Sequence, residues 1–212
     1  MKKPNIVNFL KFSFAAFFVL LFLTSCSDSD VDQLIDKVLA SEHRTPSNVN
    51  RDKFRHPKET LLFFGLSPEQ SVVEITPGFG WYAEILAPLL RDKGQYYYTS
   101  YKLHKDINPF FIKMEQKFKE KMKLNPNIYE KLRWVHFKSN QPDFVPDGPV
   151  DMVLTFRNVH NWAKAGTAES MFAGFNKALK PGGVLGLIEH RAKPSTPIEQ
   201  QIKSGYMTVE YV

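Results

Sequence analysis

The chain has 212 residues, a length that suits one α/β domain and an export leader, and its 43% hydrophobic content is ordinary for a globular protein. Its formal net charge is +6, but Lys2, Lys3 and Lys11 contribute three of those charges from an N-terminal stretch without acids. The rest of the chain is only mildly basic, which argues against a nucleic-acid partner.

Residues 1–25 have the parts of a secretory signal peptide. The lysines lead into an apolar run at 12–23 that only Ser13 interrupts. A run of about 12 residues lies within the range of signal peptides, roughly 7–15, and is shorter than the ~20 residues that a membrane-spanning helix needs. We therefore expect export, with an uncleaved N-terminal anchor helix as the alternative.

Leu23-Thr24-Ser25-Cys26 resembles the lipobox of bacterial lipoproteins, and Cys26 is the only cysteine in the chain. The resemblance implies cleavage by signal peptidase II and a lipid on Cys26, which makes the membrane a partner. Ser27 resembles the signal that sorts lipoproteins to the outer membrane. The expected location is thus the cell envelope, at the outer membrane facing the periplasm, with residues 26–54 as a tether and an N-terminal helix.

Spacing and helix-terminating residues predict the helices and strands. Apolar side chains recur at helical spacing over 30–41, residues 44–54 are predicted to be irregular, and 57–64 is predicted to be a helix that Pro57 starts and Gly65 stops. Further strands are predicted at 72–75, 95–99, 134–137, 152–156 and 184–189, and helices at 81–90, 109–123 and 167–179. This alternation predicts an α/β fold, a Rossmann-like doubly wound, mostly parallel sheet with helices on both faces.

The turn after the first predicted strand, Glu74-Ile75-Thr76-Pro77-Gly78-Phe79-Gly80, is the most informative segment. Glycines at such a turn let the backbone approach a ligand closely and let a helix start at once. Ligands of open α/β sheets bind beyond the carboxyl ends of the strands, which is where this turn lies.

Gly78-x-Gly80-x-x-Ala83 also satisfies the dinucleotide-binding pattern. That pattern expects an acid about 20 residues further on to hold a ribose, at the end of the second strand. Residues 98–101 are Tyr, Thr, Ser and Tyr instead, and Asp106 is the nearest later acid. The missing acid counts against a dinucleotide and leaves open how any ribose would be recognised.

The turn resembles the first motif of class I S-adenosylmethionine-dependent methyltransferases, an acid followed by alternating glycines, with Thr76 in place of the usual first glycine. With the motifs that follow, the chain resembles a family of predicted, often exported, bacterial methyltransferases. The motifs are His56-Pro57, residues 62–65, Pro77-Gly78-Phe79-Gly80-Trp81-Tyr82, residues 157–162, Lys180-Pro181-Gly182-Gly183 and Glu189-His190-Arg191. The resemblance implies that S-adenosylmethionine is the cofactor and that Glu74, Thr76, Pro77, Gly78, Gly80 and Trp81 bind it.

Residues 157–162 leave the fourth predicted strand where this fold places the methyl acceptor. Asn158 can hydrogen-bond a substrate, His160 can take a proton because its pKa lies near neutrality, and Arg157 can hold a carboxylate or phosphate. We expect these three residues to be catalytic, with Asn161 and Trp162 binding substrate. The structural alternatives are that His160 bonds a backbone carbonyl, that Arg157 pairs with Glu189, and that Trp162 belongs to the core.

The last predicted elements of the chain differ from those of a typical class I methyltransferase. A class I methyltransferase sheet normally has seven strands, whereas only five are predicted here, and residues 205–211 look like the start of a further helix. The domain at 55–212 is therefore expected to lack the C-terminal hairpin strands.

The sequence supports two hypotheses for the function. The first hypothesis is methyl transfer to an acceptor that the sequence does not name. The second is a non-catalytic, membrane-anchored lipoprotein that keeps the fold as a binding module. No Cys/His set with zinc-ligand spacing occurs, so no metal is expected.

Overall fold

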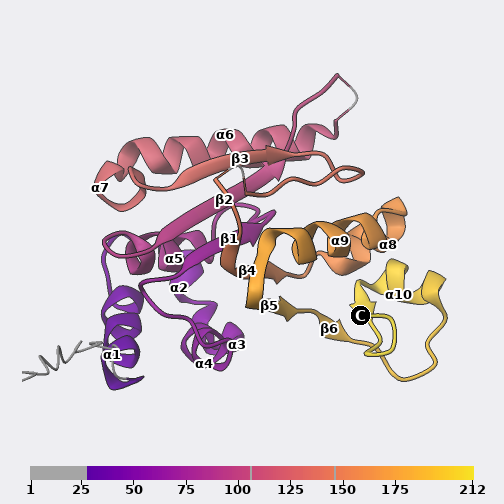
Figure 1. Ribbon diagram of the computed structural model, residues 1–212, viewed down its shortest axis with the longest axis horizontal. Helices are drawn as coiled ribbons and strands as arrows, with labels where there is room; N and C mark the ends of the chain where they lie inside the picture. The colour runs from indigo at the N-terminus through magenta and orange to yellow at the C-terminus, as the bar shows by residue number, and fades with distance from the viewer. Residues whose placement is uncertain (1–27, 106, 146) are drawn as a thin grey trace, which may run out of the picture.

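The computed structural model describes residues 28–105, 107–145 and 147–212 (Figure 1). At its centre is a five-stranded, fully parallel sheet in the order β3-β2-β1-β4-β5. The strands are β1 Ser71–Ile75, β2 Gln95–Tyr101, β3 Arg133–Phe137, β4 Val150–Phe156 and β5 Leu179–Ile188. The predicted doubly wound α/β fold is confirmed. The leader, Cys26 and Asp106 lie outside the described residues.

Helices cover both faces of the sheet because successive side chains of a strand point to opposite faces. Val72 packs into the core of one face and Val73 into the core of the other. The first face carries α1 (Asp28–Leu39), α4 (Pro57–Phe63), α5 (Ala83–Leu90), α6 (Pro109–Leu124) and α7 (Pro126–Tyr129), and the second carries α8 (Val159–Ala165) and α9 (Ala168–Ala178). Across the described residues, no helix is long and apolar enough to cross a membrane.

The segment that follows α1 is more ordered than its sequence suggests. Residues 44–54 were predicted to be irregular, and that prediction was wrong, because α2 (Pro46–Val49) and α3 (Asp52–Arg55) form there. A helix of a single turn is too short to show an apolar periodicity, so the pattern could not reveal it. Pro46 starts α2, a position where its missing N–H costs nothing.

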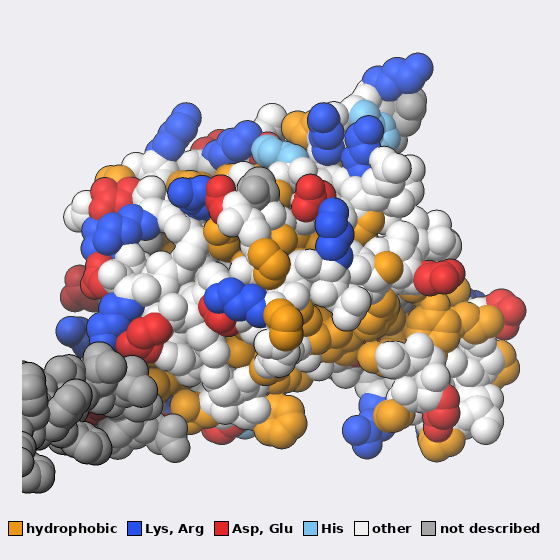
Figure 2. All heavy atoms as spheres, in the orientation of Figure 1, with side chains coloured by type: hydrophobic (Ala, Val, Ile, Leu, Met, Phe, Trp, Pro, Cys, Tyr) orange, Lys and Arg blue, Asp and Glu red, His pale blue; other side chains and the backbone are white. Residues whose placement is uncertain are grey.

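The Lys180–Gly183 turn does not precede the fifth strand but lies inside it. Leu179 pairs with Val150 and Val184 pairs with Met152, so the residues between them form a bulge in β5. β5 therefore begins immediately after α9 and lies at the edge of the sheet. Its Val184 and Ile188 side chains are exposed, and Figure 2 shows hydrophobic side chains gathered around this part of the molecule.

Residues 205–211 do not begin a helix, which corrects the prediction. Helix α10 (Ile198–Ser204) comes before them and ends at Gly205, whose left-handed backbone (φ +71°) terminates it. The chain then forms β7 (Tyr206–Met207), which pairs in parallel with β6 (His190–Arg191). Met207 is buried in the core beside α8 and α9 and fastens this end of the chain to the domain.

Candidate functional site

A cavity of about 1190 Å³ lies beyond the carboxyl ends of β1, β2, β3 and β4. It opens where the sheet order reverses, because β1 has β2 on one side and β4 on the other. This is the place where open α/β sheets bind ligands. The turn after β1, the segments after β2 and β3, and the loop after β4 contribute to its lining. Residues 43–55, which we call the N-terminal wall, supply a further side through Asn48, Arg51 and Arg55.

The turn between β1 and α5 has three residues in left-handed conformations: Thr76 (φ +46°), Gly78 (φ +68°) and Gly80 (φ +79°). A side chain at Gly80 would place its Cβ 2.3 Å from Cε2 of the buried Phe118, so the packing there requires glycine. A Cβ at Gly78 would meet nothing within 4 Å, and Gly78 lines the cavity. The backbone of this turn is thus exposed to a ligand at Gly78 and packed on the core at Gly80.

Thr76 takes the place of a glycine and keeps the left-handed turn. Its backbone N–H donates to Thr99 Oγ1 at 3.1 Å, and the Thr99 hydroxyl donates to the Glu74 carbonyl at 2.9 Å, which ties the turn to β2. The Thr76 hydroxyl is buried and has no hydrogen-bond partner in the described part of the chain. Buried hydroxyls are normally satisfied, so this group fits a ligand that fills the cavity.

Glu74 is almost completely buried, yet it contributes to the cavity lining. Its carboxyl accepts a hydrogen bond from the Tyr96 hydroxyl at 2.6 Å. Burial raises the pKa of Glu74 to about 8, although the Tyr96 hydrogen bond and the charge of Arg55 act in the opposite direction. The predicted acid of the motif is therefore a neutral carboxyl at pH 7, able to donate as well as accept a hydrogen bond.

Asn158, the N-cap of α8, and Asn161 in the same helix line the cavity as the sequence suggested. Asn158 Nδ2 donates to the carbonyl of Ile75 at 3.0 Å and to Thr155 Oγ1 at 3.1 Å, so it fastens the ends of β1 and β4 together. Both contacts use the amide nitrogen. The amide oxygen Oδ1 is the atom that Asn158 can offer to a ligand.

Arg157 and His160 lie outside the cavity lining and gather around Glu189 instead. Glu189 Oε1 is 3.4 Å from Arg157 Nε and 3.3 Å from His160 Nδ1, and Oε2 accepts a hydrogen bond from the Val159 backbone. Gly205 covers the cluster, since a Cβ there would lie 3.6 Å from both Arg157 and His160. The structure therefore shows the structural alternative for Arg157, an ion pair with Glu189.

The two predicted tryptophans differ in their surroundings. Trp162 is 1% exposed, and its ring packs 5.4 Å from that of Phe175 in the core of the second face. Trp81 lines the cavity, and its indole N–H donates to the Asn48 carbonyl at 3.0 Å. The Arg55 guanidinium lies 4.6 Å from the Trp81 ring centroid. Trp81 thus joins the glycine turn to the N-terminal wall, whereas Trp162 belongs to the core.

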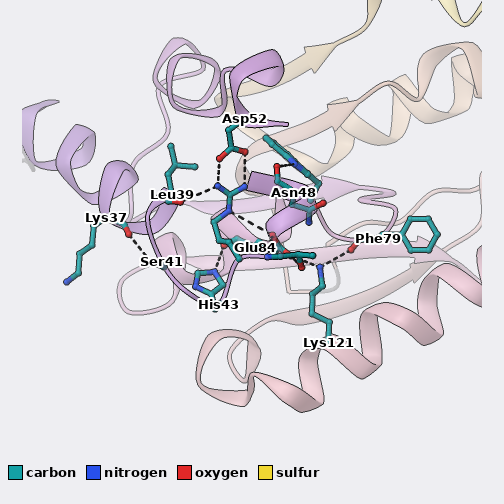
Figure 3. Close-up of polar contacts among 12 residues, drawn as sticks. Lys37, Leu39, Ser41, His43, Asn48, Asp52, Phe79, Glu84 and Lys121 are labelled. Carbon is teal, nitrogen blue, oxygen red and sulfur yellow. Dashed lines mark hydrogen bonds and ion pairs between the residues drawn. The ribbon is translucent and has the colours of Figure 1, made fainter. Parts of the chain in front are cut away.

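A buried charged network, which the sequence reasoning missed, holds the N-terminal wall in place (Figure 3). Glu84 of α5 is fully buried and accepts from the Thr45 hydroxyl and from Lys121 Nζ, each at 2.6 Å. Arg44, also buried, pairs with Asp52, and its Nε lies 3.9 Å from Glu84 Oε2. The one available signal was a glutamate in an otherwise apolar helix, Ala83–Leu90.

At the end of β2, where an acid was expected, a carboxylate arrives from another element. Ser100 donates to Glu115 of α6 at 3.1 Å and accepts from the Trp134 indole at 2.8 Å. Lys119 and His136 also contact Glu115, so its oxygens are already engaged. Nowhere among the described residues is a group of three or more His, Cys, Asp or Glu side chains placed to hold a metal ion.

The chain matches no protein-family model and no curated protein. Its structure is similar to that of a SAM-dependent methyltransferase from Aquifex aeolicus, with a TM-score of 0.54 and 20% identity over 78% of this chain and 77% of that chain. It is also similar to coclaurine N-methyltransferase bound to N-methylheliamine and SAH, with a TM-score of 0.50 and 10% identity over 75% of this chain and 49% of that one. The fold is class I methyltransferase-like. The cavity of this protein lies beside its glycine turn, where the sequence motif predicted a ligand.

Proposed function

We propose that this protein transfers a methyl group from S-adenosylmethionine to an acceptor bound in the cavity. The observation that carries the proposal is the left-handed turn at 76–80, which opens at Gly78 onto a large cavity at the reversal point of the sheet. The similarity of the fold to two methyltransferase structures, one of them bound to SAH, supports it. When bound, the cofactor supplies a methyl group on a positively charged sulfur.

The residues of the turn fit such a cofactor. The unpartnered Thr76 hydroxyl and the open backbone at Gly78 would hold its polar parts, with Pro77 and Trp81 beside them. Phe79 and Phe110, whose rings meet edge to face 5.8 Å apart, line the cavity and offer an apolar surface to a flat base. Glu74 would serve as a neutral hydrogen-bonding group rather than as a counter-ion.

The chain's own contribution to the reaction is alignment of two reactants. Asn158 is oriented by its two Nδ2 contacts, so Oδ1 is positioned in the cavity wall and can accept a hydrogen bond from an amine or hydroxyl of the methyl acceptor. Asn161 lies in α8, the helix that Asn158 begins, and lines the same cavity. His160 would act on the acceptor only indirectly, through the Glu189 cluster that holds the start of α8.

Calorimetric titration of the full chain with S-adenosylhomocysteine, with NAD as the control ligand, tests the proposal. We expect saturable binding of S-adenosylhomocysteine alone, and loss of that binding in Gly78→Val. Gly65→Val is the matched control, because Gly65 is also left-handed and open to solvent but lies outside the cavity lining. A flat trace from folded protein would overturn the proposal and leave a binding module that uses the fold for another purpose.

We further propose that the protein is a lipoprotein anchored through Cys26 at the outer membrane, facing the periplasm. The support is the leader at 1–25 and the single cysteine that follows it. Metabolic labelling with an alkyne-tagged fatty acid should mark the wild-type chain and not Cys26→Ala. Equal labelling of the two chains would contradict the lipid on Cys26. Recovery of the wild type in the inner-membrane fraction would contradict the outer-membrane location.

A further inference from the structure

The cavity is bordered by cationic side chains. Arg51 and Arg55 come from the N-terminal wall, Lys102 follows β2, and Lys138 follows β3. Among the described residues, Glu74 is the only carboxyl in the lining, and burial raises its pKa to about 8. At neutral pH the described lining thus carries several positive charges, and its one carboxyl is mostly protonated.

Arg51 and Arg55 are positioned to act together. They stand four residues apart, Arg51 as the N-cap and Arg55 as the last residue of α3, and both line the cavity. Burial lowers the pKa of Arg55, and the neighbouring positive charge of Arg51 lowers it further. The positive charge of Arg157 acts on the Arg55 pKa in the same direction.

No carboxylate among the described residues forms an ion pair with either of these arginines. Asp52, the acid between them, is taken by Arg44, which donates to both of its carboxylate oxygens. The Arg55 guanidinium instead lies over the Trp81 ring, 4.6 Å from its centroid. Arg51 is exposed and Arg55 is half-buried. Two like charges without an acidic partner are less favourable than the same two joined by an anion, and guanidinium groups bind carboxylate and phosphate in a two-pronged geometry.

We propose that Arg51 and Arg55 bind a carboxylate or phosphate group of a ligand in the cavity. Two sources share this chemistry: the carboxylate at the amino-acid end of the cofactor, and an anionic group on the methyl acceptor. The naming of these two sources rests on the proposed function, whereas the anion site itself rests on the two arginines and their surroundings.

The experiment compares three probes on the full chain and on Arg51→Gln, Arg55→Gln and the double variant. The probes are S-adenosylhomocysteine, 5′-methylthioadenosine, which lacks the carboxylate, and inorganic phosphate added to the protein already saturated with S-adenosylhomocysteine. Binding is followed by calorimetry. Lys53→Gln is the control. It removes one positive charge from the same helix, at a position outside the cavity lining. Thermal unfolding shows that each variant is folded.

Each outcome has a defined meaning. If the site holds the cofactor carboxylate, the arginine variants bind S-adenosylhomocysteine at least tenfold more weakly and 5′-methylthioadenosine unchanged. If it holds the acceptor's anion, both nucleosides bind unchanged and phosphate binding falls at least tenfold. The proposal is overturned if all three probes bind the double variant as they bind Lys53→Gln.

Failure of the proposed function gives a separate result. If neither nucleoside binds the wild type, methyl transfer is rejected, and phosphate is then titrated into the protein without a nucleoside. Phosphate binding that disappears in Arg55→Gln supports the anion site by itself. Absence of phosphate binding to the wild type in that case overturns the anion site as well.

Discussion

The Tyr96 hydroxyl donates a hydrogen bond of 2.6 Å to the Glu74 carboxyl, and both side chains are buried on the first face of the sheet. A buried carboxyl with one neutral donor is not compensated for its lost hydration, so the charged form is disfavoured. This pair places a neutral acid at the edge of the cavity, where the motif alone would suggest a negative charge. Its titration can be measured through stability.

Glu74 should make the protein less stable as the pH rises. Its pKa is about 8 in the folded protein against an ordinary value of 4.5, so between these values the unfolded chain has released a proton that the folded chain still holds. The contribution of Glu74 to the free energy of unfolding is therefore fully present below pH 4.5 and is lost as the pH rises towards 8. Urea unfolding at pH 5 and pH 8 should show a loss on the order of a few kcal/mol for the wild type relative to Glu74→Gln. Identical pH dependence of the two proteins would contradict the assignment.

Glu84→Gln should destabilise the protein and loosen the N-terminal wall. The substitution leaves Arg44 and Lys121 beside a neutral group in a buried setting, and removing one partner of a buried ion pair costs about 3–5 kcal/mol. Denaturant unfolding measures the loss, and limited trypsin digestion should cut faster between residues 44 and 55. Glu130→Gln, at a half-exposed ion pair with Arg91, is the control and should cost less than about 1 kcal/mol. Equal effects would show that the network does not hold the wall.

Gly80→Ala should be more damaging than Gly78→Ala. Both glycines are left-handed, which costs an alanine about 1 kcal/mol at either position. Only at Gly80 does the new methyl group also overlap Phe118, whose ring cannot move freely because it is stacked on Tyr98 at 4.1 Å. Overpacking of this kind adds about 1–3 kcal/mol. Thermal unfolding should rank Gly80→Ala below Gly78→Ala, and the reverse order would contradict the packing of this turn.

Trp162→Ala and Asn161→Ala should separate stability from binding. Trp162 is buried against Phe175, so its truncation should cost about 3–5 kcal/mol in denaturant unfolding. Asn161 is exposed at the cavity, so its truncation should change stability by less than about 0.5 kcal/mol. Under the proposed function, Asn161→Ala lowers methylation of the acceptor once that acceptor is known. A small stability effect at Trp162 would return that residue to the candidate site.

The sheet was predictable because β1, β2 and β4 are largely buried runs, and each of them is followed by a helix. Asn108, for example, was expected to cap the helix that begins at Pro109, and its side chain accepts from the Phe110 N–H at 2.9 Å. The bulge at 180–183 was not predictable, since a Lys-Pro-Gly-Gly sequence suits a turn between elements equally well. Its place inside β5 depends on pairing with β4.

The sequence predicted the part of the candidate site that the strand ends form, and it missed the part that the N-terminal wall forms. The glycine turn and Asn158 are local features of strand ends, so their motifs located them correctly at the cavity. Arg51 and Arg55 reach it because long-range contacts hold the N-terminal wall, among them the hydrogen bond from Thr45 to Glu84, which is 39 residues away in the sequence. A contact of that range leaves no periodic signal in either segment.

The Arg44, Glu84 and Lys121 cluster restricts which substitutions this sequence can accept during evolution. Its three charged groups come from the N-terminal wall, α5 and α6, and together with Asp52, the ion-pair partner of Arg44, they make two positive and two negative groups around the buried Glu84. A substitution at one position alone leaves an unbalanced charge that the fold tolerates poorly. Across homologous chains these positions and Asp52 should therefore vary together, and a lineage that replaces Glu84 with an apolar residue should also have replaced Lys121.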